Sequence, residues 1–222
     1  MIDPKIESAV EAALHAFSRY NDFNAVSFVA KFKNVFASDA DFMSKVDLLD
    51  EVFDDNPKLE ALREVFFDLL MINFFSADVK KLEEDYLETQ EWEDIEEQTL
   101  DRGTELLNLL LYLNECEDED IEPELEDYLK EFLLVDEDEF QDEYRIYEPV
   151  IENQILMESP VAEISRVAKA LPEDSEIKDI FYPMMCFFQG TATGDYEKDK
   201  IAASATEKDF DMAVLEILIN FN

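Results

Sequence analysis

The sequence predicts an all-α protein, and three observations predict it. The chain of 222 residues contains only 3 glycines, whereas sheet proteins use glycine in hairpin turns and bulges. Apolar residues recur every three to four positions, which is the spacing of a helix that buries one face. Capping side chains repeatedly stand before a proline, as at the first turn of a helix. We therefore expect about ten amphipathic helices in antiparallel pairs, arranged as a multi-helix bundle or a short helical-hairpin array, in a single helical domain over residues 1–222.

In the first part of the chain, caps and stripes mark each predicted helix. Asp3 precedes Pro4 and Asn56 precedes Pro57, so that both prolines can occupy the first helical position. An apolar stripe that begins at Ile6 repeats with the helical period, and so do the stripes that follow it. The expected helices cover residues 4–20, 23–36, 40–54, 57–75 and, with a break, 78–101.

The second part of the chain carries the same signals. Ser159 precedes Pro160, and Pro123 and Pro149 are interpreted as further helix starts. Residues 189–195 contain two of the glycines, and we expect a loop there before the last helix. The expected helices cover residues 104–115, 123–134, 137–153, 160–171, 175–189 and 206–220.

The charge of the chain excludes several classes of partner. There are 57 acidic and 18 basic residues, which gives a formal net charge of -39. Because nucleic acids and anionic lipid surfaces need basic side chains to neutralise their phosphates, we expect no direct nucleic-acid binding and no membrane association. A surface of this sign attracts basic proteins, although a halophilic origin would also explain an acid excess. The 18 phenylalanines and a hydrophobic share of 47% indicate a folded body beneath the charge.

The charge is unevenly distributed. Residues 77–148 hold 29 of the 57 acidic residues but only 5 of the 18 basic ones. Two interpretations remain open: a solvated surface that aids solubility, and a docking face for a basic partner, since crowded carboxylates destabilise a compact state. On the second interpretation, the candidate partner-binding residues are Glu93, Glu96, Glu97, Asp101, Glu117, Asp118, Asp136 and Asp138.

Catalytic signals are weak in this sequence. His15 is the only histidine, which leaves no second imidazole for a zinc site and no other base for a catalytic triad. Acidic pairs one turn apart, Glu93 with Glu96 and Glu124 with Asp127, have the spacing that a metal-dependent nucleotide phosphohydrolase would use. Chance alone supplies about 14 such windows in so acidic a chain, so the pairs carry little weight. We expect no catalytic residues, no metal and no cofactor.

The cysteines and the first residues suggest a compartment. Cys116 and Cys186 are too few for a secreted disulfide scaffold, and the first residues lack the basic and apolar regions of a signal peptide. We therefore expect a cytoplasmic protein. We also expect the acidic neighbours of Cys116 to raise the pKa of its thiol.

The leading functional hypothesis is a non-catalytic acidic binding protein that docks a basic protein, in the manner of an immunity protein or of a DNA mimic. The alternatives are a helical scaffold that uses an apolar groove and the phosphohydrolase named above. The aromatic and methionine residues of segment 181–188 could line such a groove or pack in the core.

Overall fold

The computed structural model describes residues 2–77, 84–133, 140–190, 192 and 194–222. Over these residues the chain forms helices, turns and irregular segments and no strand, which confirms the predicted all-α fold class. The elements are α1 (Pro4–Ser18), α2 (Ala25–Phe36), α3 (Phe42–Asp54), the 3-10 helix η1 (Pro57–Leu62), α4 (Arg63–Ala77), α5 (Glu84–Leu87), α6 (Gln90–Thr99), α7 (Leu106–Asp118), α8 (Leu125–Leu133), α9 (Phe140–Glu152), the 3-10 helix η3 (Gln154–Glu158), α10 (Val161–Ala168), α11 (Lys178–Phe188), α12 (Asp195–Ser204) and α13 (Lys208–Phe221).

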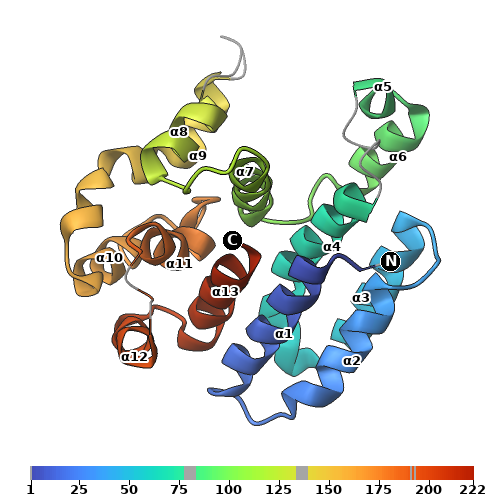
Figure 1. The fold of residues 1–222 in the computed structure, drawn as a ribbon, viewed down its shortest axis with the longest axis horizontal. Helices are drawn as coiled ribbons and strands as arrows, with labels where there is room; N and C mark the ends of the chain where they lie inside the picture. Colours follow the sequence, from blue (N-terminus) through green and yellow to red (C-terminus); the bar gives the residue numbers. More distant parts are fainter. Residues whose placement is uncertain (1, 78–83, 134–139, 191, 193) are drawn as a thin grey trace.

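The helices are arranged around two central elements, α7 and α13 (Figure 1). Helices α1 to α4 lie on one side of them, and α8 to α12 lie on the other. Helix α13 packs against both α1 and α11, while α7 packs against both α4 and α8. The last helix of the chain therefore joins its first helix to the late helices. None of the helices in the described part of the chain is both long and apolar enough to cross a lipid bilayer.

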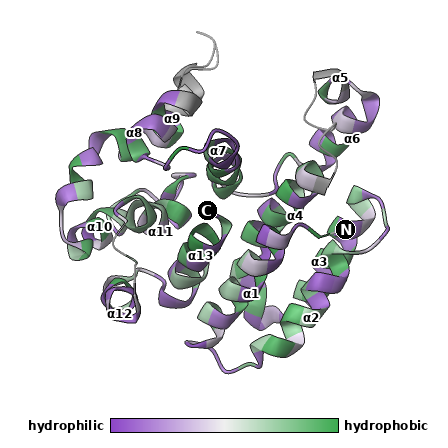
Figure 2. Ribbon diagram, in the orientation of Figure 1, coloured by the Kyte–Doolittle hydropathy of each residue, from purple (hydrophilic) through white to green (hydrophobic). Residues whose placement is uncertain are grey.

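Helix α13 forms the centre of the core. Every residue from Phe210 to Leu218 is buried, and Figure 2 shows most of this helix as hydrophobic. A helix that is apolar nearly all round is stable only when other elements cover it on all sides. The helix also buries two carboxyl groups. Lys198 Nζ lies 2.6 Å from Glu216 Oε1, and the Thr206 backbone N–H donates to Asp211 Oδ2, whereas Asp211 Oδ1 is buried without a hydrogen-bond partner among the described residues. The buried hydrophobic residues from α1 to α13 form one cluster, and the single-domain organisation stays a prediction.

One helix, α12, was missing from the sequence prediction, which placed only a loop before the last helix. Of its residues, only Ile201 and Ala202 are buried. It therefore lacks the apolar stripe that makes an amphipathic helix recognisable. Its exposed face carries Tyr196, which is 67% exposed.

The prolines act as start signals in some places and not in others. Pro4 is the first residue of α1 and Asp3 caps it, as predicted, and Pro57 begins the 3-10 helix η1. The interpretation of Pro149 as a helix start is wrong, because this residue lies inside α9. Proline removes only one backbone donor there, and the Asn153 side chain donates to the Pro149 carbonyl at 2.8 Å. Pro160 occupies the N-cap position of α10, one residue before the helix begins, and makes no side-chain capping hydrogen bond.

Candidate functional site

A groove with an apolar floor and an acidic edge lies between α4, α6 and α7. Its volume is about 840 Å³. Figure 1 shows α6 at the periphery of the molecule beyond one end of α4, whereas α7 lies near the centre. The groove thus runs from the core of the fold to one of its most acidic helices.

The floor of the groove comes from α4 and α7. Phe67, Met71 and Phe75 occur at successive turns of α4, and Leu107 and Leu111 occur in the same way on α7. Because residues four apart share one face of a helix, each set forms a ridge along the groove. The α4 residues are buried, and the two leucines of α7 are half-buried.

The outer wall of the groove is α6. This helix begins at a defined cap, because the Thr89 hydroxyl accepts a hydrogen bond from the Trp92 backbone N–H at 3.3 Å. The Trp92 ring packs on Phe75 with 5.4 Å between ring centroids, and Ile95 is buried on the same side. This packing directs Glu93 and its acidic neighbours to the solvent edge of the groove.

Three exposed carboxylates form this edge, and we call Glu93, Glu96 and Glu97 the acidic rim. None of the three side chains forms an ion pair or a hydrogen bond with another described residue. Glu96 and Glu97 stand in the last turn of α6, which holds no basic residue, so both face the negative end of the helix dipole. Each such charge costs about 0.3–1 kcal/mol. Leu100 follows the rim and is 82% exposed.

Arg102 closes one end of the groove. Its guanidinium lies 4.8 Å from the centroid of the Phe67 ring. Both of its terminal nitrogens donate to Asp50, at 3.0 and 3.1 Å, and its Nε donates to Glu64 at 3.0 Å. These bonds and the two carboxylates raise the pKa of Arg102 even though burial opposes this. The only described cation that lines the groove is therefore already neutralised by α3 and α4.

The segment between Arg102 and α7 is anchored by a buried carboxyl group. Asp68, on α4, accepts hydrogen bonds from the Thr104 hydroxyl at 2.6 Å and from the Thr104 backbone N–H at 3.0 Å. Burial, with a contribution from nearby Glu64 and Glu105, raises the pKa of Asp68 to about 8, although the two donated bonds oppose this shift. Gly103 has φ +85° and donates its N–H to Glu64 at 2.8 Å.

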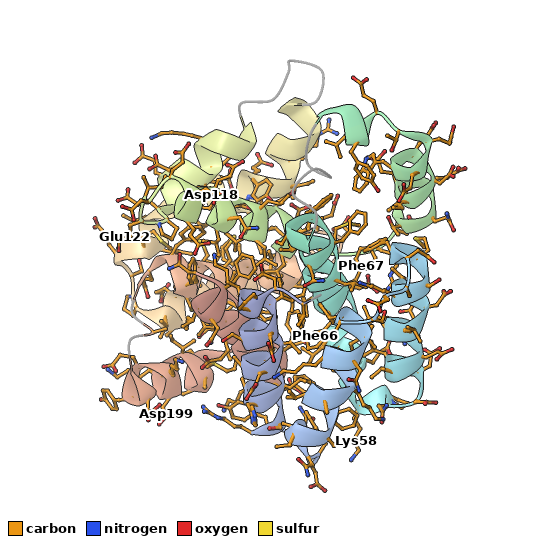
Figure 3. The ribbon with its side chains drawn as sticks, turned by 45° about the vertical axis from the view of Figure 1, so that its right-hand side comes forward. Lys58, Phe66, Phe67, Asp118, Glu122 and Asp199 are labelled. Carbon is orange, nitrogen blue, oxygen red and sulfur yellow. The ribbon has the colours of Figure 1, made fainter. Side chains whose placement is uncertain are left out.

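The predicted partner-binding residues do not all lie together. Glu93, Glu96 and Glu97 share the groove, whereas Asp101 is exposed just beyond it and does not line it. Glu117 and Asp118 lie at the far end of α7, on the other side of the molecule from α6, as the position of Asp118 in Figure 3 shows. There Glu117 forms an ion pair with Lys5. Asp136 and Asp138 lie outside the described residues.

The sequence did not single out the hydrophobic half of the groove. Phe67, Met71 and Phe75 have the spacing of an ordinary core stripe, and only the packing of α6 and α7 around α4 places them at the base of a groove. Exposed Leu100 beside the rim was the available signal, because an apolar residue among acids breaks the polar pattern of a solvated face. Most of segment 181–188 packs in the core, where Phe181, Tyr182, Met184, Met185 and Cys186 are buried. Phe187 and Phe188 are only partly buried, and Phe188 lines a separate pocket.

The acidic pairs that the phosphohydrolase hypothesis requires are not brought together in the described part of the chain. No group of three or more potential metal ligands occurs among the described residues, so the carboxylates of Glu93 and Glu96 are not gathered with those of Glu124 and Asp127. His15 is exposed on α1, as expected for a residue that flanks the apolar stripe. Burial raises the thiol pKa of Cys116, with smaller contributions from the acidic neighbours that predicted this direction, and the pKa of Cys186 rises to about 12.

Comparisons with known proteins give no family for this chain. No protein-family model matches it, and no curated protein or solved structure shows significant similarity to it. The fold and the groove define an all-α protein with an acid-edged apolar groove.

Proposed function

We propose that this chain is a non-catalytic binding protein and that its groove docks an apolar, basic segment of another protein. The observation that carries this proposal is the acidic rim beside an apolar groove whose outer residues, Leu87 and Leu100, are exposed. Glu96 and Glu97 oppose the helix dipole, and Glu93 and Glu97 are like charges one turn apart. Among the described residues, no cation offsets these costs. A basic partner would supply the missing cations, and its apolar side chains would cover Leu100 and the floor.

The groove also helps to choose between the two forms of the acidic-protein hypothesis. A mimic of DNA would present carboxylates in the manner of phosphates, with no need for an apolar floor. Protein interfaces instead combine an apolar centre with a polar edge. We therefore favour an inhibitor-like or immunity-like protein that covers a basic protein surface. The cytoplasmic location and the identity of the partner stay predictions.

The test uses the association rate of a basic, apolar probe peptide. Trp92 is the only tryptophan of the chain and lines the groove, so its fluorescence reports occupancy. The probe is a tryptophan-free peptide of leucine and lysine, about 18 residues long. We expect replacement of the acidic rim (E93Q, E96Q and E97Q together) to slow stopped-flow association roughly 3–10-fold at low salt, because exposed rim charges act on the encounter rate. We also expect it to flatten the dependence of the rate on salt.

A matched control removes the same charge elsewhere. Glu152, Asp174 and Glu176 are exposed and do not line the groove, so the variant E152Q, D174N, E176Q should leave the rate within about twofold of the wild type. The rim variant should at the same time be as stable as the wild type or more stable, because it removes charges that oppose the dipole of α6. Equal slowing in both variants would show that only net charge matters and would refute the proposal.

A helical scaffold that binds through the apolar groove alone is the second candidate. It is favoured by Leu100 and by Leu87, which is 42% exposed on the same groove. In that case salt would leave the association rate of the probe unchanged while the variant L100S slowed it. Because Leu100 is almost fully exposed, this substitution leaves the fold intact.

A further inference from the structure

We propose that the occupant of the groove is an amphipathic α-helix of the partner, with apolar residues at one-turn spacing and lysine or arginine along the flank that faces α6. This inference rests on the proposed function and specifies the conformation and charge pattern of the bound segment. Three features of the described residues support it: the helical spacing of the apolar residues in the floor, the position of the acidic rim on the α6 side only, and the absence of a strand.

The floor has the spacing of a helix-binding surface. Phe67, Met71 and Phe75 form a ridge along α4, and Leu107 and Leu111 form a second ridge along α7. Eight residues of helix span about 12 Å, so the α4 ridge extends over more than two helical turns. The α4 ridge is buried and the α7 ridge is half-buried, so side chains three and four residues apart on another helix would insert into the groove of about 840 Å³ that these ridges line. Helix-in-groove recognition uses this spacing of anchors.

The placement of charge gives the bound helix a preferred rotation. All three carboxylates of the acidic rim lie on the α6 wall, whereas the α7 wall contributes leucines. Arg102, at the end of the groove, is held by Asp50 and Glu64 and adds no free positive charge. A helix with basic residues on only one flank of its apolar stripe matches this asymmetry. A second copy of this chain also has a net charge of -39, so electrostatic repulsion between the two chains argues against self-association in the groove.

An extended occupant fits less well. Peptides that bind as strands gain their main-chain hydrogen bonds from an exposed sheet edge. The described part of this chain has no strand to offer one.

The experiment compares two peptide isomers with the full-length chain. Both contain the same numbers of leucine and lysine, about 18 residues in all, with blocked ends. In the first, leucines follow a spacing of three and four residues, and lysines fill the rest of the helix surface, including the flank that would lie along α6. In the second, leucine and lysine alternate strictly, which favours a strand. The affinities are measured through Trp92 fluorescence, and the helical content of the bound peptide is measured by circular dichroism.

We expect the helical isomer to bind at least roughly tenfold more tightly and to gain helix on binding. The affinity for the helical isomer should be lowered more by the rim variant than by the control variant E152Q, D174N, E176Q. Equal affinity of the two isomers, with the effect of the rim retained, would overturn the helix inference and leave the proposed function standing. Absence of rim-dependent binding by either isomer would overturn both. If the helical isomer bound more tightly but neither the rim variant nor L100S changed its affinity, the peptide would bind outside the groove. That result would also overturn the inference.

Discussion

Replacement of Gly103 by alanine should lower the free energy of unfolding by about 2–4 kcal/mol. Gly103 has φ +85°, a conformation that disfavours any residue with a Cβ. The added Cβ would also lie 2.5 Å from Asp68 Oδ1 and 3.3 Å from the Phe67 ring. Asp68 is fully buried and holds Thr104, so it has no room to move without breaking the anchor of the segment before α7.

Gly190 offers a matched control for this substitution. It also has positive φ, at +66°, but nothing lies within 4 Å of its added Cβ. Gly190→Ala should therefore cost only the backbone strain, about 1–2 kcal/mol, and less than Gly103→Ala. Urea denaturation followed by far-UV circular dichroism measures both. Equal costs would show that the contact between Gly103 and Asp68 does not constrain the fold.

The stability of the protein should depend on pH through Asp68. Burial raises the pKa of this carboxyl group to about 8, well above its ordinary value near 4 in an unfolded chain. The folded state therefore retains a proton that the unfolded state loses. The stability linked to Asp68 is fully present below pH 4 and is lost progressively as the pH rises toward and through 8.

The variant Asp68→Asn removes this titration while its amide oxygen can still accept from Thr104. Relative to the wild type, its free energy of unfolding should rise by a few kcal/mol between pH 5 and pH 9, on the scale of about 1.4 kcal/mol per pKa unit. The self-repulsion of the other acids is nearly the same in both proteins, so the difference isolates Asp68. Denaturation curves at constant ionic strength measure it, and parallel pH profiles would contradict the buried, protonated carboxyl group.

Asp211→Asn gives an internal comparison for the pH range. Burial raises the pKa of Asp211 to about 6, so its contribution is lost between about pH 4 and pH 6. The difference between this variant and the wild type should therefore be complete near pH 6, whereas the difference caused by Asp68→Asn continues to grow until about pH 8.

The sequence predicted best where local signals and tertiary packing agree. The cap at Asp3, Pro4 at the first position and the apolar stripe from Ile6 all specify α1, and the structure has all three. The sequence of α12 lacks these signals, because only Ile201 and Ala202 are buried and they form no apolar stripe along the helix. At Pro149 the local signal and the structure disagree, because proline indicated a helix start and this residue lies inside α9.

The acidic half of the groove could be predicted, and its apolar half could not. Charge counts depend on composition alone, so they led to Glu93, Glu96 and Glu97 before any fold was known. The same counts could not separate these residues from Glu117 and Asp118, which lie at the other end of α7. The floor depends on the packing of α4, α6 and α7, which brings Phe75 and Leu111 to one surface from distant positions in the chain.

NMR mapping of the bound helical peptide shows whether the groove between α4, α6 and α7 is the binding site. Full-length chain labelled with nitrogen-15 is titrated with the leucine–lysine helix, and the shifts of backbone amides and of the Trp92 indole N–H are followed. We expect the largest shifts on Trp92, Leu100, Leu107 and Leu111, around the groove. Largest shifts at the far end of α7, around Glu117 and Asp118, or small shifts spread over all acidic surfaces, would contradict the groove as the binding site.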